Sequence, residues 1–253
     1  MEPLTAGAAF TDNTGDAVTM ETVVSMTASL KKMSSIQEEI FKFVLSGDLE
    51  ALKQLLAGVE ESEESREQNL FGQKDEVGRN ALMTASMLGR SDLVRELVAH
   101  GAPVNDQTVR GFSALHLTAC WGRVDTARTL LELGADLKAE TFKGETPVDL
   151  SRIYAKTDCI DCLILADAKQ DLMSYVNHIK DMINKSDREL TKKEKNICTS
   201  NLSAKSDWIQ NVKNQTVSDF TAQRRDLEDA LQPILSKLSA HSAEMPVKQA
   251  GQA

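Results

Sequence analysis

This chain has little of several features that mark other classes of protein. Aromatic residues make up 4% of its 253 residues, and it contains five prolines. Its apolar runs are too short for a membrane helix, which needs about twenty consecutive apolar residues. Residues 1–30 contain Glu2, Asp12 and Asp16 but no lysine or arginine, so the basic start of a secretory signal peptide is absent. We expect a cytoplasmic protein with no membrane partner.

Cysteine is also scarce. The chain has four cysteines, Cys120, Cys159, Cys162 and Cys198, and without a signal peptide they fit a reduced intracellular protein better than a disulfide scaffold. Cys159 and Cys162 have a spacing found in zinc sites, but they lie in a predicted helix and lack a second pair. We therefore expect no disulfide framework and no bound metal.

The chain also lacks a strongly basic segment. The formal net charge is −9, and residues 170–237 hold eleven basic against ten acidic residues. No segment could neutralise many phosphates, so we expect no nucleic-acid partner. Acidic residues concentrate in one run that either solvates an insertion, the usual role of such runs, or docks a basic partner. This run contains Glu60, Glu61, Glu63, Glu64 and Glu67.

The middle of the chain contains a repeated pattern of 33 residues. One copy, GRNALMTASMLGRSDLVRELVAHGAPVN, begins at Gly78, and a second, GFSALHLTACWGRVDTARTLLELGADLK, begins at Gly111. A weaker third copy, GETPVDLSRIYAKTDCIDCLILADAK, begins at Gly144. The residue pattern of each copy predicts a turn, a short helix, a tight turn and a second helix. A fixed period of this length predicts a solenoid of stacked units. The residues predicted to face its core are Leu82, Ala85, Leu97, Leu115, Ala119 and Leu130.

The three copies resemble ankyrin repeats. Their tetrads are NALM, SALH and TPVD, which compare with the TPLH pattern of that family. The resemblance implies an all-α solenoid with short β-hairpin fingers and a concave groove that binds another protein. We divide this region, residues 35–169, into a divergent cap at 35–58, an acidic insertion at 59–74 and repeats at 75–107, 108–140 and 141–169.

The two ends of the chain differ from the repeats in composition. Residues 1–34 are rich in threonine, alanine, glycine and serine, so they cannot offset the entropy of ordering by burying apolar surface. We expect a disordered N-terminal segment there and a disordered tail at 239–253.

Residues 170–238 predict a small helical bundle. They contain no glycine and one proline, and their apolar residues keep a helical period. Thr191 and Glu194 have the spacing of a capping box. Three helices at roughly 170–184, 191–213 and 216–238 would place Trp208, Ile209 and Val212 in the middle of the bundle.

The segment SDFTAQRRDLEDALQPILSKL, residues 218–238, resembles the final lid helix of the seventy-kilodalton heat-shock chaperones. The matching positions are Phe220, Leu227, Glu228, Pro233 and Ile234. The phosphate loops and peptide-binding sandwich of that family are absent, so the resemblance implies no clamping of peptides. An ankyrin array joined to such a lid also resembles one group of vertebrate ankyrin repeat proteins. That resemblance implies a cytoplasmic protein linked to cell proliferation and to cytoskeletal structures, namely the division furrow or midbody, or the cilium.

No residue combination predicts catalysis. His116 stands in the SALH tetrad, where the imidazole ties the start of a helix to a neighbouring finger in ankyrin repeats. No nucleophile or second base lies at a motif spacing from it. We expect no enzyme, no catalytic residue, no cofactor and no small-molecule substrate. The other candidates considered are His100, His178, His241, Asp125 and Asp149.

The repeat register predicts a surface that binds a partner protein. Leu88, Trp121 and Tyr154 occupy one column at 33-residue steps, next to the turns between paired helices. The fingers add apolar, basic and aromatic side chains of the types that dominate interface energies. The predicted partner-binding residues are Met87, Leu88, Val109, Arg110, Phe112, Trp121 and Tyr154. In the competing interpretation, Trp121 packs only against its own repeats or the helical bundle.

The sequence therefore predicts a non-enzymatic scaffold that binds a protein of unknown identity through its concave ankyrin groove. The alternative is a chaperone-associated adaptor that acts through the lid-like C-terminal helices.

Overall fold

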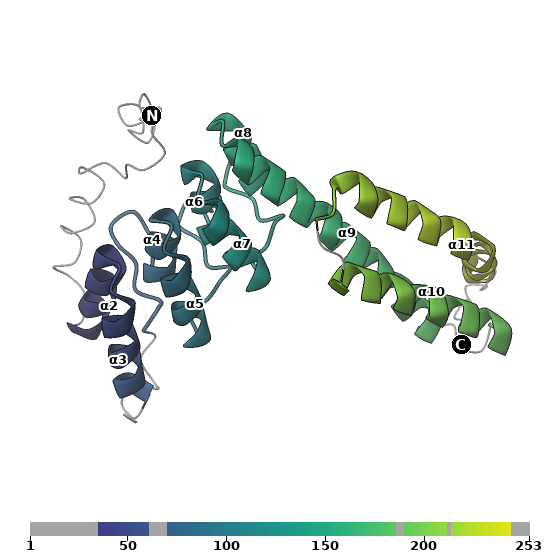
Figure 1. Cartoon of the computed structure of the whole chain (residues 1–253), viewed down its shortest axis with the longest axis horizontal. Helices are drawn as coiled ribbons and strands as arrows, with labels where there is room; N and C mark the ends of the chain where they lie inside the picture. Colours follow the sequence, from purple (N-terminus) through teal and green to yellow (C-terminus); the bar gives the residue numbers. More distant parts are fainter. Residues whose placement is uncertain (1–34, 61–69, 186–189, 212–213, 244–253) are drawn as a thin grey trace, which may run out of the picture. The chain divides into compact units, whose positions relative to one another are not determined.

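A computed structural model describes residues 35–60, 70–185, 190–211 and 214–243 (Figure 1). These ranges contain ten α-helices and no β-strand. The predicted disordered segment 1–34 and residues 244–253 of the predicted tail lie outside the described residues. So do residues 61–69, which hold most of the acidic run. None of the helices in the described ranges has both the length and the apolar character needed to span a bilayer.

The chain divides into two compact units, residues 1–163 and 164–253. The division falls inside helix α9, Thr157–Lys185, so one helix belongs to both units. The predicted domain boundary was placed six residues later, after Lys169.

Unit 1 is a stack of helix pairs. The pairs are α2 (Ser35–Ser46) with α3 (Leu49–Glu60), α4 (Ala81–Met87) with α5 (Ser91–Ala99), α6 (Ala114–Trp121) with α7 (Val124–Glu132), and α8 (Pro147–Ile153) with the start of α9. The first helices pack in the row α2, α4, α6, α8, and the second helices in the row α3, α5, α7 (Figure 1). The predicted all-α solenoid is confirmed.

The core of unit 1 lies between the two rows of helices. All six residues predicted to face inward are at most 2% exposed. Burial of a leucine side chain stabilises a fold by about 1.5–3 kcal/mol, so these repeated positions supply much of the stacking energy. The same core continues between α2 and α3, where Ile40, Val44 and Leu52 are also buried.

The first residue of each tetrad caps the first helix of its repeat. Asn80 Oδ1 accepts a hydrogen bond from the Met83 N–H (2.9 Å), and Ser113 Oγ accepts one from the His116 N–H (3.4 Å). Thr146 Oγ1 does the same for the third repeat. These bonds satisfy amide groups that have no partner within the helix.

The fingers between the helix pairs correct one prediction, because in the described residues they are turns and not β-hairpins. In the finger before α6, the Thr108 N–H donates to the Phe112 carbonyl (2.9 Å), and a single bridge joins Gln107 to Ser113. No strand can extend beyond this bridge, because Ser113 is already the N-cap of α6.

The turn between α8 and α9 has an unusual backbone. Ala155 has a φ of 51°, in the left-handed region, where the equivalent residues of the two preceding repeats are glycine. A side chain at this φ costs about 1–2 kcal/mol.

Unit 2 is a three-helix bundle of the C-terminal part of α9, α10 (Lys192–Asn211) and α11 (Val217–Ala243). Its core includes Leu172, Leu202 and Phe220, and the Trp208 ring meets the Phe220 ring edge-on at 5.4 Å. The first helix of the predicted bundle is not separate, because it continues α9. The last helix runs past the predicted end at 238, and Val212 lies outside the described residues.

Candidate protein-binding surface

Leu88, Trp121 and Tyr154 lie at the ends of the three first helices, as the repeat register predicted. Leu88 and Tyr154 are the C-caps of α4 and α8, and Trp121 is the last residue of α6. Each side chain is half-buried. Burial also raises the pKa of the Tyr154 hydroxyl, with smaller contributions from Cys120 and Glu145. We call these three residues the groove column.

The residues directly before the members of the groove column differ in the exposure of their side chains from repeat to repeat. Met87 is 2% exposed, so its predicted place on the binding surface is wrong and its side chain belongs to the core. The physical reason is that α4 packs between α2 and α6. Cys120 is buried in the same way, because α6 packs between α4 and α8. Ile153, at the same register position in α8, is 60% exposed, because α8 is the last helix in the row α2, α4, α6, α8.

Among the described residues of unit 1, two finger tips carry the most exposed large apolar side chains. Val109 is 93% exposed, and Arg110 beside it is also exposed. Phe112 is half-buried, with its ring edge-on to His116 at 6.0 Å. Phe142, which is 68% exposed, was not among the predicted binding residues. Phe142 follows Val109 by 33 residues, so the repeat register could have found it.

Hydrogen bonds fix each finger to the next. The Phe142 N–H donates to the Arg110 carbonyl (3.0 Å), which joins the second and third tips directly. Lys74 Nζ of the first finger lies 3.0 Å from Asp106 Oδ1 of the second and donates to the Gln107 carbonyl at 2.7 Å. The tips therefore form a continuous row on a rigid support.

His116 joins two repeats from the interior. Its Nδ1 accepts from the Ser113 N–H (3.1 Å), so its Nε2 carries the proton and donates to the Glu145 carbonyl (3.1 Å) of the next finger. Burial lowers the pKa of the imidazole below its ordinary value of 6.5. The expected structural role of His116 is confirmed.

Burial favours the thiol form of the three cysteines of unit 1. Burial raises the pKa of Cys120 to about 12 and that of Cys159 to about 11. The pKa of Cys162 is also raised by burial. A thiolate is the form that attacks or binds metal, so these thiols are poorly suited to either task. In the described ranges no group of three or more His, Cys, Asp or Glu side chains could hold a metal ion.

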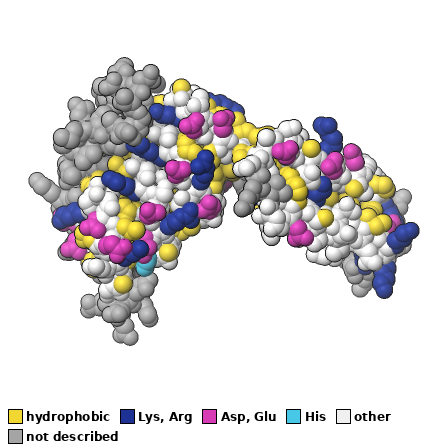
Figure 2. All heavy atoms as spheres, viewed as in Figure 1, with side chains coloured by type: hydrophobic (Ala, Val, Ile, Leu, Met, Phe, Trp, Pro, Cys, Tyr) yellow, Lys and Arg dark blue, Asp and Glu magenta, His cyan; other side chains and the backbone are white. Residues whose placement is uncertain are grey.

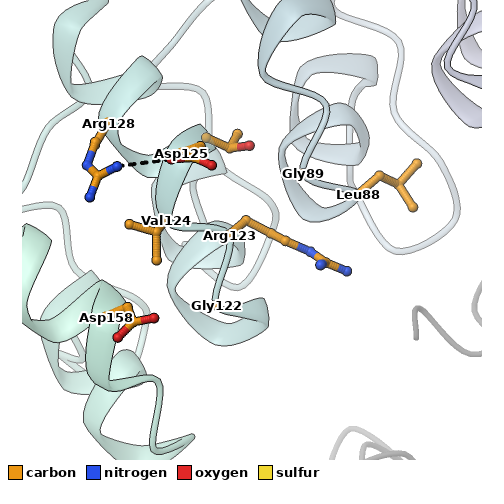
Figure 3. A pocket seen from close by; sticks show the side chains of 9 residues that line it. Leu88, Gly89, Gly122, Arg123, Val124, Asp125, Arg128 and Asp158 are labelled. Atoms are coloured by element: carbon orange, nitrogen blue, oxygen red, sulfur yellow. Dashed lines mark hydrogen bonds and ion pairs between the residues drawn. The ribbon is translucent and has the colours of Figure 1, made fainter. Parts of the chain in front are cut away.

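A shallow pocket of about 520 Å³ follows the turns between paired helices (Figure 3). Its floor includes Gly89 and Gly122, and the Arg123 side chain extends from one turn toward Leu88 and donates to the Met87 carbonyl (3.2 Å). Arg128 lies 3.0 Å from Asp125 at its edge. Because Leu88 lines this pocket as well as the groove column, the two features are adjacent.

Charges of both signs are interspersed on the visible face of the repeats, with apolar patches between them (Figure 2). Such a surface has no single-sign field and suits a protein partner that is recognised by local contacts.

Comparison with known protein families agrees with this geometry. The family model of ankyrin repeats (three copies) matches residues 40–141. Ankyrin repeat domain-containing protein 45 of Danio rerio is 44% identical over 211 residues, which cover 82% of this chain and 94% of that protein.

Two mammalian proteins of the same name are also similar. The Homo sapiens protein is 33% identical over 198 residues, which cover 77% of this chain and 74% of that protein. The Mus musculus protein is 42% identical over 198 residues, which cover 77% of this chain and 80% of that protein. This chain therefore belongs to the ankyrin repeat domain-containing protein 45 family. Its repeats imply protein partners, and none of these matches indicates a catalytic family.

Proposed function

We propose that this protein is a non-enzymatic scaffold that binds a partner protein along the groove column and the adjoining fingers. The observation that carries the proposal is the groove column itself: Leu88, Trp121 and Tyr154 are partly accessible at equal steps along the stack. Tryptophan and tyrosine are the residue types most often found at the energetic centre of an interface.

The packing of these side chains favours binding. A half-buried ring is already held in place by its own repeat, so it loses little side-chain freedom when a partner covers its remaining surface. The solenoid also repeats this arrangement three times on one support, which suits an elongated partner better than a small molecule.

Replacement of Trp121 and Tyr154 by alanine should weaken capture of the partner by about 2 kcal/mol or more, as expected for central anchors. The protein, intact or substituted, would be used to capture partners from cells, and the affinity of each captured protein would then be measured. Tyr175→Ala is the matched control, because Tyr175 is a half-buried aromatic residue in unit 2, stacked under Arg224. Unfolding of the Trp121 and Tyr154 variant would assign both rings to the core and contradict the proposal.

The second candidate is a chaperone-associated adaptor that acts through unit 2. The residues that carry the lid resemblance are mainly core residues, since Phe220, Leu227 and Ile234 are at most 7% exposed. The resemblance therefore describes how the bundle packs. An adaptor surface would have to use exposed side chains such as Met173 and Ile197.

We also propose that the protein works in the cytoplasm, at the cytoskeletal structures implied by its resemblance to the vertebrate proteins. Fluorescently tagged protein imaged through the cell cycle tests this. Enrichment at the division furrow, the midbody or the cilium is expected, and an even distribution that ignores all three would contradict it.

A further inference from the structure

Three successive finger tips present apolar side chains to solvent. Val77 is 49% exposed, Val109 is 93% exposed and Phe142 is 68% exposed. Together with the exposed cations Arg110 and Lys143, which occupy equivalent positions in the second and third fingers, they form what we call the fingertip row. Exposed apolar side chains that lie next to one another in a row often mark a site where another molecule binds.

The fingertip row is continuous from one finger to the next. The Phe142 N–H bonds to the Arg110 carbonyl, so the second and third tips share a backbone contact. A Cβ placed on Gly78 would lie 3.4 Å from the Val109 nitrogen, which shows that the first and second tips are also in contact. A single ligand segment could therefore lie across all three tips.

The charges along the fingertip row are unequal. In the described part of the chain, neither Arg110 nor Lys143 has a carboxylate within ion-pair distance. By contrast, most carboxylates of these fingers are engaged: Asp75 pairs with Arg79 at 2.7 Å, and Asp106 pairs with Lys74. Glu145 accepts from Thr141 Oγ1 (3.1 Å).

Two carboxylates complete this picture. The exposed Glu76 belongs to the first tip. Glu140, before Thr141 in the third finger, is also exposed, and its Oε2 lies 4.0 Å from where a Cβ on Gly144 would be. The fingers therefore carry charges of both signs, and the exposed cations Arg110 and Lys143 lie on the second and third tips.

We propose that the fingertip row binds a short acidic segment of a partner protein, with large apolar side chains among its carboxylates. This inference rests on the proposed scaffold function and names the chemistry of the ligand. The apolar side chains of the segment cover Val109 and Phe142, and its carboxylates pair with Arg110 and Lys143. Apolar contacts supply most of the affinity, whereas exposed charges mainly set the association rate.

The test begins with a phage-displayed library of random twelve-residue peptides selected on the full-length protein. The affinities of the enriched peptides are then measured by fluorescence anisotropy. We expect peptides rich in Asp and Glu with Phe, Leu or Trp between them. The double variant Arg110→Glu with Lys143→Glu should bind them at least tenfold more weakly, and Phe142→Ser at least fivefold more weakly. Added salt should weaken binding to the unsubstituted protein.

The matched control is Lys192→Glu with Lys193→Glu, which makes the same change in net charge at exposed positions in unit 2. It should bind the peptides within twofold of the unsubstituted protein. Acidic residues are tolerated there because they lie in the first turn of α10. Equal melting temperatures of all variants establish that the fold is kept, as expected for substitutions at exposed tips.

Enriched peptides that are basic, or whose affinity the fingertip variants leave unchanged, would overturn the inference. So would a selection that enriches none. These failures are distinguishable from failure of the scaffold function, which depends on capture that is sensitive to Trp121 and Tyr154. Capture lost on substitution of those rings, together with peptides indifferent to Arg110 and Phe142, would overturn the fingertip inference alone.

Discussion

At the residue scale, His116 shows how one side chain can be both a helix cap and a link between repeats. Its two ring nitrogens have different partners, Ser113 on its own helix and the Glu145 carbonyl on the next finger. A protonated ring could not accept the bond from the Ser113 N–H, so the folded structure favours the neutral form. Burial lowers the pKa of the imidazole, which also favours the neutral ring.

The stability of the protein should therefore fall as the pH falls below about 6.5. The folded-state pKa of His116 lies below its unfolded value, so the unfolded chain binds more protons in this range and is favoured by acid. One such group contributes a slope of at most about 1.4 kcal/mol per pH unit. Urea unfolding at pH 7.5, 6.5 and 5.5 measures it. His116→Gln should reduce the slope, and an unchanged slope in that variant would assign the effect to other groups.

At the element scale, the fingers are held by close backbone contacts that a sequence pattern does not reveal. Gly111 has a φ of 80°, and a Cβ there would lie 3.0 Å from the Thr141 Cα and the Phe142 nitrogen of the next finger. Gly134 has a φ of 87°, but a Cβ there would meet no atom within 4 Å. Both glycines therefore have a left-handed backbone, but only Gly111 has backbone atoms of the next finger in the space that a side chain would occupy.

Gly134→Ala should cost about 1–2 kcal/mol, the penalty of a left-handed alanine. Gly111→Ala should cost clearly more, because its methyl group must also displace the backbone of the neighbouring finger. The free energies of unfolding in urea compare the two. Equal losses would show that the fingers shift apart without resistance.

At the scale of the whole molecule, two units with separate cores share α9. Unit 1 uses the start of this helix, where Cys159 and Leu163 are completely buried, and the core of unit 2 begins at Leu172. A chain that ends at Lys169 therefore keeps all the contacts of α9 within unit 1.

Such a truncated chain should fold and, if the groove column binds the partner, capture it with an affinity within about twofold of the full chain. Circular dichroism melting checks the fold, and capture followed by an affinity measurement checks the function. Retained folding with lost capture would favour the adaptor role of unit 2. The full-length Trp121 and Tyr154 variant serves as the reference for loss of binding through the repeats.

The repeat spacing was enough to predict the solenoid, its inward-facing residues and the alignment of the groove column in one register, because all of these follow from one local pattern copied along the chain. It left open how far the groove column is buried. It could not separate Met87 from Ile153. These residues share a register position, and their exposure depends on whether a helix packs on both sides. The finger turns differed from hairpins because the N-caps Asn80, Ser113 and Thr146 end the fingers directly before α4, α6 and α8.

Ala155, with its φ of 51°, makes the joint between α8 and α9 the costly one in a series otherwise built on glycine. In a linear stack each repeat is stabilised only by its neighbours, so unfolding begins where a junction is weakest. The repeat that ends in this alanine is therefore the place where the stack should fray first, and its outermost helix α8 carries Ile153 and Tyr154 to the surface. A ligand that binds at this end of the stack would therefore also raise the free energy of unfolding of the repeats.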